Sequence, residues 1–175
     1  MNQTSGQPTV PTTTPEGRPQ WAKLIMAVVA GILVAVAVDI WSAYQAAWEK
    51  MLRMDCRHSL NLLGLLCREY AAVHEGRFPS TWVELESVEY GTNSIQLFRC
   101  PSAGHEIGAW AQVDSWSDYR LLPGRSTNDP PDRLLALEPP GNHQGAGGNV
   151  LFVDGSTQWW PLARLLKAAT NNVTR

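Results

Sequence analysis

The side chains best suited to bind a metal ion lie in the last third of the chain. Glu138, His143 and Asp154 flank a glycine-rich segment, residues 145–148, and they would come together if that segment folds back. Carboxylate oxygens suit calcium, whereas an imidazole nitrogen favours a transition metal. A simpler interpretation is that Asp154 belongs to a turn and that His143 braces the loop through backbone hydrogen bonds. The sequence offers this one metal site and predicts no other cofactor.

Cysteine chemistry is limited by the positions of the three cysteines. Cys56 and Cys67 lie on one expected helix, about 16 Å apart at 1.5 Å per residue, which exceeds the limit of about 7 Å between bridged Cα atoms. An internal disulfide must therefore use Cys100. We favour Cys67 with Cys100, because Cys67 is nearer the globular end of the helix. A core containing three thiols is equally compatible with the sequence.

A catalytic role for these residues is the weaker hypothesis. Nucleophilic catalysis needs a nucleophile beside a base, and Cys100 with His105 or His143 is the combination that the sequence could assemble. HExxH, paired CxxC and GxSxG motifs do not occur. Residues 145–148 are rich in glycine, but they precede a strand, whereas a phosphate-binding loop joins a strand to a helix. We therefore expect a flexible loop there and no enzymatic activity.

The composition argues against nucleic acid as a partner. The chain has 175 residues, with 14 Lys and Arg against 16 Asp and Glu, and no basic block. Phosphate binding requires clustered positive charge. The eight tryptophans include the adjacent Trp159 and Trp160, and core packing explains them more simply than a carbohydrate- or peptide-binding surface does. The length suits one modest domain with an appendage.

An apolar segment near the N-terminus predicts a membrane-spanning helix. Residues 1–20 are rich in Pro, Thr and Gly, so we expect a disordered tail. Residues 24–38 are fifteen consecutive residues without a polar side chain, and Trp21 and Trp41 bracket them as aromatic residues do at membrane interfaces. Residues 21–41 therefore form the expected transmembrane segment, close to the length of ~20 residues that crosses a bilayer.

The fate and the orientation of this segment have alternatives. A cleaved secretory signal could use a site at Ala35-Val36-Ala37. Lys and Arg residues occur on both sides of the span, so charge alone does not set its direction. We favour an uncleaved or pilin-type single-pass anchor in the cytoplasmic membrane, with the C-terminal domain on the extracytoplasmic (periplasmic) side.

The helical pattern continues through residues 42–76, the expected soluble continuation of the helix. Apolar side chains recur every three or four residues and form a stripe, which we expect to pack against the globular part or against neighbouring copies. The stripe contains Trp48, Leu52, Leu60, Leu63, Leu66 and Tyr70. Gly76 and Pro79 end the helix. His58 and His74 also lie on it, and we assign them no role.

Residues 77–175 predict a small α+β domain. Residues 81–84 (TWVE) form a capping box that opens a short helix to about Val88. Between Tyr90 and the C-terminus, short apolar patches alternate with Gly, Pro, Asn and Asp. The expected fold class is therefore α+β, with a long N-terminal membrane-spanning helix that continues as a spine packed on a small antiparallel sheet.

A hairpin and a C-terminal helix are the clearest elements of this domain. Asp154-Gly155 predicts a tight turn between strands at residues 149–153 and 156–160. Pro161 suits the first turn of a following helix. We expect Leu162, Leu165 and Leu166 on the buried face of that helix.

Several motifs occur in an order that resembles one bacterial family. A hydrophobic helix is followed by Gly-x-Phe-Pro, then Cys-Pro-Ser, then a His before an Asn-Val-Leu-Phe-x-Asp-Gly hairpin. This order is similar to that of pseudopilin-like proteins with a prepilin-type processing-associated H-X9-DG domain. The matching residues are Gly76, Phe78, Pro79, Cys100, Pro101, Ser102, His143, Asn149, Asp154 and Gly155. Two features depart from the family pattern. Ten residues, not nine, separate His143 from Asp154. Pilin leaders carry a Glu at the fifth position after a glycine, whereas the fifth residue after Gly31 is not a Glu.

The resemblance implies a pilin-like body on a membrane helix that works by assembly and not by chemistry. Its partners would be the membrane and other pilin-like subunits, or proteins of a type II secretion or pilus-like system, in a homo- or hetero-oligomer. The residues themselves leave a second hypothesis, a membrane-tethered extracytoplasmic module that binds a ligand or metal and does not assemble.

Overall fold

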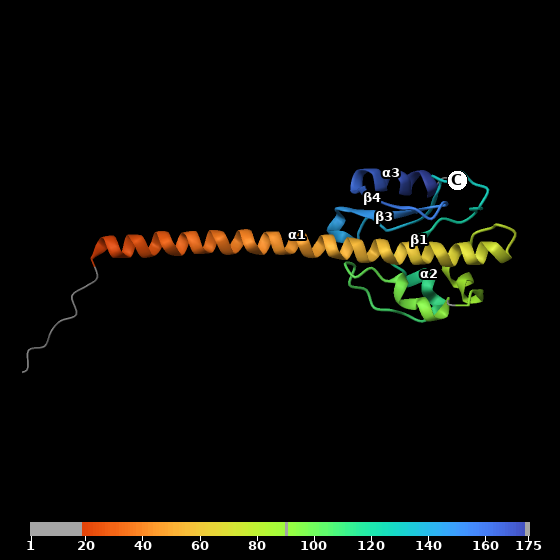
Figure 1. Cartoon of the computed structure of the whole chain (residues 1–175), viewed down its shortest axis with the longest axis horizontal. Coiled ribbons are helices and arrows are strands. Elements are labelled where there is room, and N and C mark those ends of the chain that lie inside the picture. The colour runs from red at the N-terminus through yellow and green to blue at the C-terminus, as the bar shows by residue number, and fades with distance from the viewer. Residues whose placement is uncertain (1–18, 90, 174–175) are drawn as a thin grey trace, which may run out of the picture. The chain divides into compact units, whose positions relative to one another are not determined.

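The structure, a computed structural model, describes residues 19–89 and 91–173 and is α+β, as expected (Figure 1). Apart from its last two residues, the expected tail of residues 1–20 lies outside the described part. The elements are α1 (Gln20–Val73), α2 (Val113–Trp116), α3 (Leu162–Val173), β1 (Arg120–Leu121), β2 (Leu134–Leu137), β3 (Gly147–Phe152), β4 (Thr157–Pro161) and the 3₁₀ helices η1 (Trp82–Ser87), η2 (Thr92–Phe98), η3 (Trp110–Gln112) and η4 (His143–Gly145).

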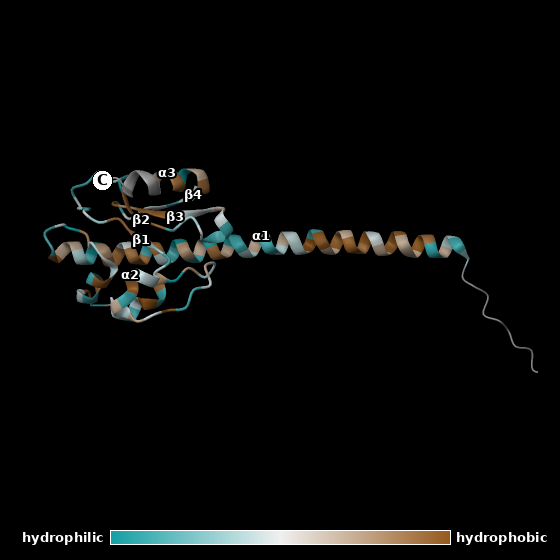
Figure 2. Ribbon diagram, turned by 180° about the vertical axis from the view of Figure 1, so that it is seen from behind, coloured by the Kyte–Doolittle hydropathy of each residue, from teal (hydrophilic) through white to brown (hydrophobic). Residues whose placement is uncertain are grey.

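The chain divides into two compact units, Met1–Tyr44 and Gln45–Arg175. In the first unit, the side chains of α1 are exposed almost throughout and strongly hydrophobic (Figure 2). Among the described residues, α1 is the helix that is long and apolar enough to cross a membrane. Length and composition alone would also suit a signal sequence. The helix residues from Gln45 onward belong to the same compact unit as the strands.

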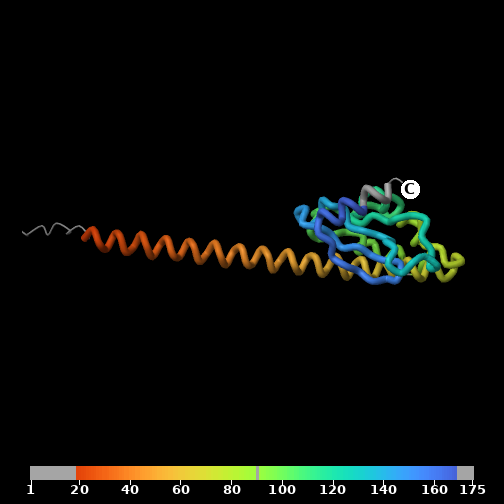
Figure 3. The backbone as a smooth tube through the Cα atoms, turned by 90° about the horizontal axis from the view of Figure 1, so that it is seen from above, coloured from red at the N-terminus to blue at the C-terminus, as the bar shows by residue number. Residues whose placement is uncertain are grey.

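Within the unit Gln45–Arg175, α1 is the central layer. Figure 1 shows the sheet on one side of it and the segment with η1, η2 and α2 on the other. The sheet is an antiparallel meander in the order β1-β2-β3-β4, and α3 packs on the face of the sheet that points away from α1. The chain after α1 therefore folds back along the helix, as the tube in Figure 3 shows.

Strand β3 is buried on both faces, which explains its apolar sequence. Leu151 belongs to the core around α1, whereas Val150 and Phe152 belong to a second core with Leu165 of α3. The side chains alternate between the two faces because the period of a strand is two. Helix α1 approaches β3 closely at Gly64, where a Cβ atom would lie 3.0 Å from Leu151 Cδ1.

The expected helix stripe packs inside its own chain. Leu60 and Leu63 are fully buried and Leu66 is nearly so, in one core with Phe98 and Leu151. Of the other stripe residues, Leu52 and Tyr70 are half-buried and Trp48 is exposed. The stripe therefore serves the first of its two expected uses, packing against the globular part, and its buried leucines are not a contact surface for neighbouring copies.

The end of α1 agrees with the glycine signal. The helix ends at Val73, and Gly76 has φ +77° with its N–H donating to Ala71 O at 2.9 Å. This is the 6→1 bond of a Schellman cap, in which Glu75, with φ +55°, takes the left-handed C′ position and Gly76 follows it. The carbonyl of Gly76 also accepts a hydrogen bond from the N–H of Thr127, at 2.8 Å. Gly76 thus ends the helix and also contacts the distant loop at Thr127.

The capping box is a prediction that the structure corrects. The short helix exists, but it is the 3₁₀ helix η1, and the Thr81 side chain makes no capping hydrogen bond. Thr81 bonds to Glu84 Oε1 instead, and the carboxylate of Asp114 accepts from the N–H groups of Trp82 (2.6 Å) and Val83 (3.2 Å). A residue distant in sequence caps the helix, which a local pattern does not encode.

The hairpin is confirmed, with different ends. Gly147 and Gly148, expected in a flexible loop, form the first two residues of β3. The connection keeps Gly155 at φ +82°, but Asp154 is not left-handed, so the turn is not the expected two-residue type.

The C-terminal helix also departs from the expected pattern. Pro161 ends β4, and α3 starts at the next residue. Leu165 is fully buried and Leu162 half-buried as expected, but Leu166 is 46% exposed. Leu166 was therefore wrongly placed on the buried face.

A glycine at the start of β3 provides the first testable prediction. Gly147 has φ +151°, and a Cβ atom there would lie 2.2 Å from Trp160 O. We expect Gly147→Ala to lower the free energy of unfolding by about 2–4 kcal/mol, because the strained φ and the backbone clash add. Denaturant titration followed by tryptophan fluorescence measures this. Gly141→Ala is the control, since a Cβ atom there meets nothing within 4 Å; equal effects of both variants would contradict the explanation.

Candidate functional site

Four buried polar or thiol side chains from separate segments meet inside the unit Gln45–Arg175. Cys56 comes from α1, Cys100 from the segment after η2, Glu138 from the residue after β2, and His143 from η4. Each is 0% exposed, and their potential ligand atoms all lie within 4.8 Å of one another. We call these four residues the buried cluster.

The contacts inside the buried cluster run in a chain. Cys100 Sγ lies 2.9 Å from Cys56 Sγ and 3.7 Å from His143 Nε2. The same Nε2 atom lies 3.2 Å from Glu138 Oε2. Two sulfurs, one imidazole nitrogen and one carboxylate oxygen therefore face a common point.

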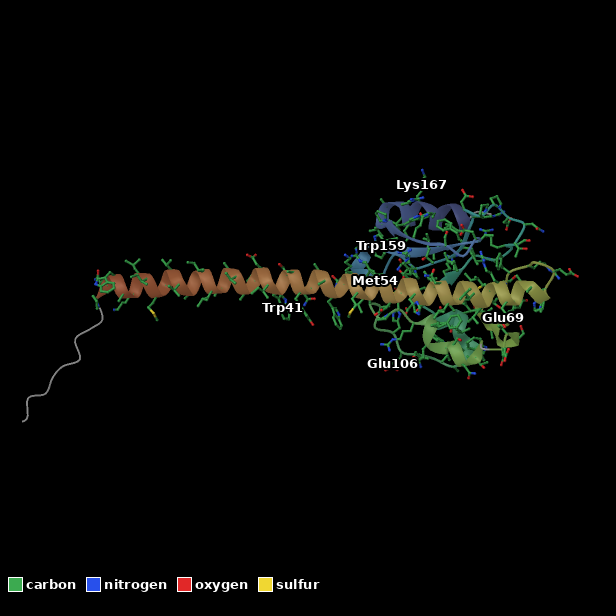
Figure 4. The ribbon with its side chains drawn as sticks, viewed as in Figure 1. Trp41, Met54, Glu69, Glu106, Trp159 and Lys167 are labelled. Atoms are coloured by element: carbon green, nitrogen blue, oxygen red, sulfur yellow. The ribbon has the colours of Figure 1, made fainter. Side chains whose placement is uncertain are left out.

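The other nitrogen of His143 is held by a carboxylate on α1. His143 Nδ1 lies 2.8 Å from Glu49 Oε1. Arg53 Nε pairs with the same oxygen at 3.4 Å, and the Ser102 hydroxyl donates to Glu49 Oε2 at 3.3 Å. Trp159 packs edge-on to the His143 ring, with centroids 5.3 Å apart, and Arg53 of α1 lies over the Trp159 ring, 4.2 Å from the centroid. Figure 4 labels Trp159 on the side of α1 that carries the sheet. The imidazole therefore has a fixed orientation.

Glu138 is fixed by Asn149 of β3. The backbone N–H of Asn149 donates to Glu138 Oε2 at 2.7 Å, and its side-chain Nδ2 donates to Oε1 at 3.2 Å. That Nδ2 also donates to Arg53 O at 3.1 Å, which joins β3 to α1. A buried carboxylate needs such donors, because burial without hydrogen bonds is costly.

The backbone at His143 is strained. His143 and Gln144 have φ values of +53° and +55°, in the left-handed region that few residues other than glycine adopt. Strain of this kind costs about 1–3 kcal/mol and persists where surrounding contacts determine the conformation. Here Asn142 Nδ2 donates to Asp118 O at 3.1 Å, and Asp118 Oδ2 accepts from the Cys100 N–H at 2.9 Å. Asp118 thereby ties the His143 turn to Cys100.

Hydrogen bonding sets the protonation of the cluster. The hydrogen bond with Cys56 is the largest cause that lowers the pKa of Cys100, to about 6; burial opposes it and the His143 contact adds to it. Burial lowers the pKa of His143, but hydrogen bonds with Cys100 and Glu138 outweigh it and raise the pKa to about 10. The pKa of Cys56 is strongly raised, first by its hydrogen bond to Cys100 and then by burial. These directions favour the thiol at Cys56 and the thiolate at Cys100.

A buried hydroxyl next to the cluster lacks a partner. Tyr119 OH has no hydrogen-bond partner among the described residues. Burial is the largest cause that raises the pKa of Tyr119, and interaction with the side chain of Cys56 adds to it, which places the hydroxyl near that sulfur. Native structures contain few such groups, and each one points to a missing or distorted partner.

The expected metal set is only partly assembled. Glu138 and His143 come together as predicted, but Asp154 was wrongly included. It is exposed, and its Oδ1 accepts from the N–H of Ser156 at 2.8 Å, as a turn residue does. Arg68 donates to the Asp154 carbonyl. The cluster contains two cysteine sulfurs in place of the expected Asp154 carboxylate. Calcium prefers oxygen ligands, so this set of side chains does not suit calcium.

The expected pairing of Cys67 with Cys100 is also wrong. All three cysteines are free and buried, and Cys100 contacts Cys56. The reason is that the chain folds back along α1 and brings Cys100 next to Cys56. Cys56 lies about 16 Å from Cys67 along the helix axis. Cys67 lies in the apolar core, where burial raises the pKa of its thiol.

Sequence reasoning missed two members of this site, Cys56 and Glu49. Both lie on α1, seven residues apart and therefore on one face of the helix. A carboxylate and a thiol on the same otherwise apolar face, two turns apart, are the signal that could have found them. Of the remaining histidines, His105 is exposed and contacts Asp118 at 2.5 Å, His58 is exposed, and His74 stacks on Tyr70.

The chain was compared with known proteins at three levels. No family model, no curated protein and no solved structure matches it.

Proposed function

We propose that this protein is a membrane-anchored, pilin-like assembly subunit without enzymatic activity. The observation that carries the proposal is that the two parts of α1 have different surroundings. Residues 24–38 are apolar and exposed, whereas the same helix from Gln45 onward forms the central layer of an α+β unit. The proposed location is the cytoplasmic membrane, with the unit Gln45–Arg175 on the periplasmic side.

The motif residues support the pilin-like assignment through their structural roles. Gly76 ends α1, and Phe78 is buried. Cys100 and His143 are buried where the later segments meet α1, and Asn149 connects β3 to the same helix. A family motif built from such positions would preserve the docking of a domain on its helix.

The proposed contact surface for assembly is the exposed part of α1. Ala27, Gly31 and Ala35 recur every four residues on one face, and a Cβ atom at Gly31 would meet nothing within 4 Å. Small residues at this spacing let two helices approach closely in a membrane. The proposed occupant of this face is the same segment of a second copy of the chain.

Burial of the cluster argues against catalysis. The sequence offered Cys100 with His105 or His143 as nucleophile and base. Cys100 and His143 do meet, but both are 0% exposed. None of the described clefts is lined by either of them. In this structure a substrate in any of these clefts would not touch Cys100.

Cross-linking of the full chain in lipid vesicles tests the assembly proposal. We expect wild-type protein to form dimers and larger species, and Gly31→Leu to reduce them several-fold, because leucine keeps the helices apart. Val29→Leu is the matched control: Val29 is exposed on the opposite face of the helix, so the oligomers should persist. A wild-type protein that stays monomeric at every protein-to-lipid ratio would overturn the proposal.

The second candidate is a membrane-tethered module that binds a metal and does not assemble. The buried cluster is the specific observation that favours it, since its side chains could hold an ion without any partner chain. A monomeric wild-type protein in the vesicle experiment would favour this function.

A further inference from the structure

The buried cluster has the donor atoms of a closed transition-metal site. We propose that Cys56, Cys100, Glu138 and His143 bind one Zn²⁺ ion through the two Sγ atoms, Nε2 and Oε2. This inference does not depend on the assembly role, and it would hold for an assembling subunit and for a tethered module alike.

The donor types select the metal. Thiolate and imidazole ligands favour zinc and other transition metals, whereas calcium and magnesium prefer a shell of oxygens. Four protein ligands leave no open position for a substrate, which is typical of a structural and not a catalytic zinc site. The complete burial of all four residues agrees with a structural role.

Two contacts in the cluster already have the separations of a tetrahedral zinc site, and the remaining pairs, all within 4.8 Å, would adjust. Zinc bonds of about 2.3 Å to sulfur and 2.0–2.2 Å to nitrogen or oxygen imply separations of about 3.5 Å between sulfur and nitrogen and about 3.3 Å between nitrogen and oxygen. The observed Cys100–His143 and His143–Glu138 distances are 3.7 Å and 3.2 Å. The two sulfurs, now 2.9 Å apart, would have to separate to about 3.8 Å. Side-chain rotation of Cys56 or Cys100 supplies a movement of that size.

Residues around the cluster hold the ligands as in known metal sites. A metal-bound histidine usually donates its second N–H to a carboxylate, and Glu49 stands 2.8 Å from His143 Nδ1. This contact leaves Nε2 for the ion. Asn149 holds Glu138, and the unpartnered hydroxyl of Tyr119 is buried near Cys56, where a metal-bound thiolate would accept its hydrogen bond.

The charge of the buried cluster stays the same when zinc binds. Zinc brings two positive charges, and when both cysteines bind it as thiolates, two protons leave the cluster for solvent. The net charge of the cluster is therefore the same before and after binding, so binding adds no uncompensated charge to a desolvated site, which would be expensive.

Zinc would add a direct link among four segments that hydrogen bonds and core packing already bring together. Cys56 belongs to the central helix, Cys100 to the layer on one side of it, and Glu138 and His143 to the sheet side. A ligand that binds only the folded state stabilises that state. We therefore expect the apparent melting temperature of the globular unit to fall when zinc is removed.

The test uses the full chain, purified in detergent from its native membrane. Metal analysis should find one zinc ion per chain. Zinc should be removed by a strong chelator under reducing conditions and return on addition of Zn²⁺ alone. Replacement by Co²⁺ should give the intense visible absorption and sulfur-to-metal charge-transfer bands of tetrahedral thiolate coordination, a signature that needs no variant.

The variants separate the cluster from other thiols. Cys100→Ala should abolish stoichiometric binding and the cobalt bands, and Glu49→Gln should weaken zinc affinity about 10–100-fold by releasing His143. Cys67→Ala is the matched control, because Cys67 is an equally buried thiol outside the cluster on the same helix; its metal content should be unchanged. Circular dichroism identifies a variant that has not folded.

Two results would overturn the proposal. One is a native protein lighter by two hydrogens, with a Cys56–Cys100 disulfide and no metal, even if zinc binds after reduction. The other is a reduced, folded wild-type protein that takes up neither Zn²⁺ nor Co²⁺, or one whose metal is lost equally in Cys67→Ala.

Discussion

Leu63→Asp is expected to unfold the unit Gln45–Arg175. Leu63 is fully buried in the core between α1, the sheet and η2. Loss of a buried leucine side chain costs about 2–5 kcal/mol, and an unpaired carboxylate in the same place adds several more. The sum is comparable with the whole free energy of unfolding of a typical domain, about 5–15 kcal/mol. Near-ultraviolet circular dichroism and pulse proteolysis of the full chain in detergent should show loss of tertiary structure.

Leu65→Asp is the matched control for this prediction. Leu65 lies two residues further along the same helix and is 61% exposed. A surface substitution of this kind changes the free energy of unfolding by less than about 0.5 kcal/mol. Leu63→Ala should fall between the two, with a loss of about 2–5 kcal/mol. If Leu63→Asp instead stayed folded and lost only its ability to form oligomers, the helix stripe would be an assembly surface after all.

Glu138→Ala is expected to destabilise the unit by about 3–5 kcal/mol even without metal. The carboxylate is 0% exposed, and it accepts both donors of Asn149 while it contacts Nε2 of His143. Its removal leaves the Asn149 N–H buried without an acceptor, which costs about 1–3 kcal/mol, and takes a carboxylate contact away from Nε2 of His143. Denaturant titration in the presence of chelator and reductant isolates this effect from metal binding.

Two variants sharpen the Glu138 prediction. Glu138→Gln retains an oxygen for the Asn149 N–H, so it should lose less stability than Glu138→Ala. Glu106→Ala removes an exposed carboxylate and should change the free energy of unfolding by less than about 0.5 kcal/mol. A Glu138→Ala protein as stable as Glu106→Ala would show that the cluster contributes nothing to the metal-free fold.

Local signals in the sequence identified the elements of the fold. The apolar run at residues 24–38, the periodic pattern beyond it and the stop at Gly76 defined α1 to within a few residues. Asp154-Gly155 located the hairpin, because its glycine takes the positive φ that the turn requires. These features depend on residues that are close together in the chain, so the sequence alone contains the information that predicts them.

Predictions that needed contacts between distant residues were less successful. Asp114, not Thr81, caps η1, and β1 and β2 were not foreseen because each is short and is held by its partner strand. Gly147 and Gly148 look like a loop in isolation, yet pairing with β4 makes them strand. The capping of η1 and the pairing of these glycines are settled by residues elsewhere in the chain.

The buried cluster separates what the sequence alone predicts from what only the tertiary structure decides. The sequence by itself determined an apolar helix, an α+β domain and the chemistry of Glu138 and His143 as potential ligands. Only the tertiary structure decided that Cys56 and Cys100 complete the set and that Asp154 and Cys67 do not belong to it. The physical reason is that the chain folds back along α1, and the level at which Cys100, Glu138 and His143 meet the helix is set by packing of the two cores and not by spacing along the chain.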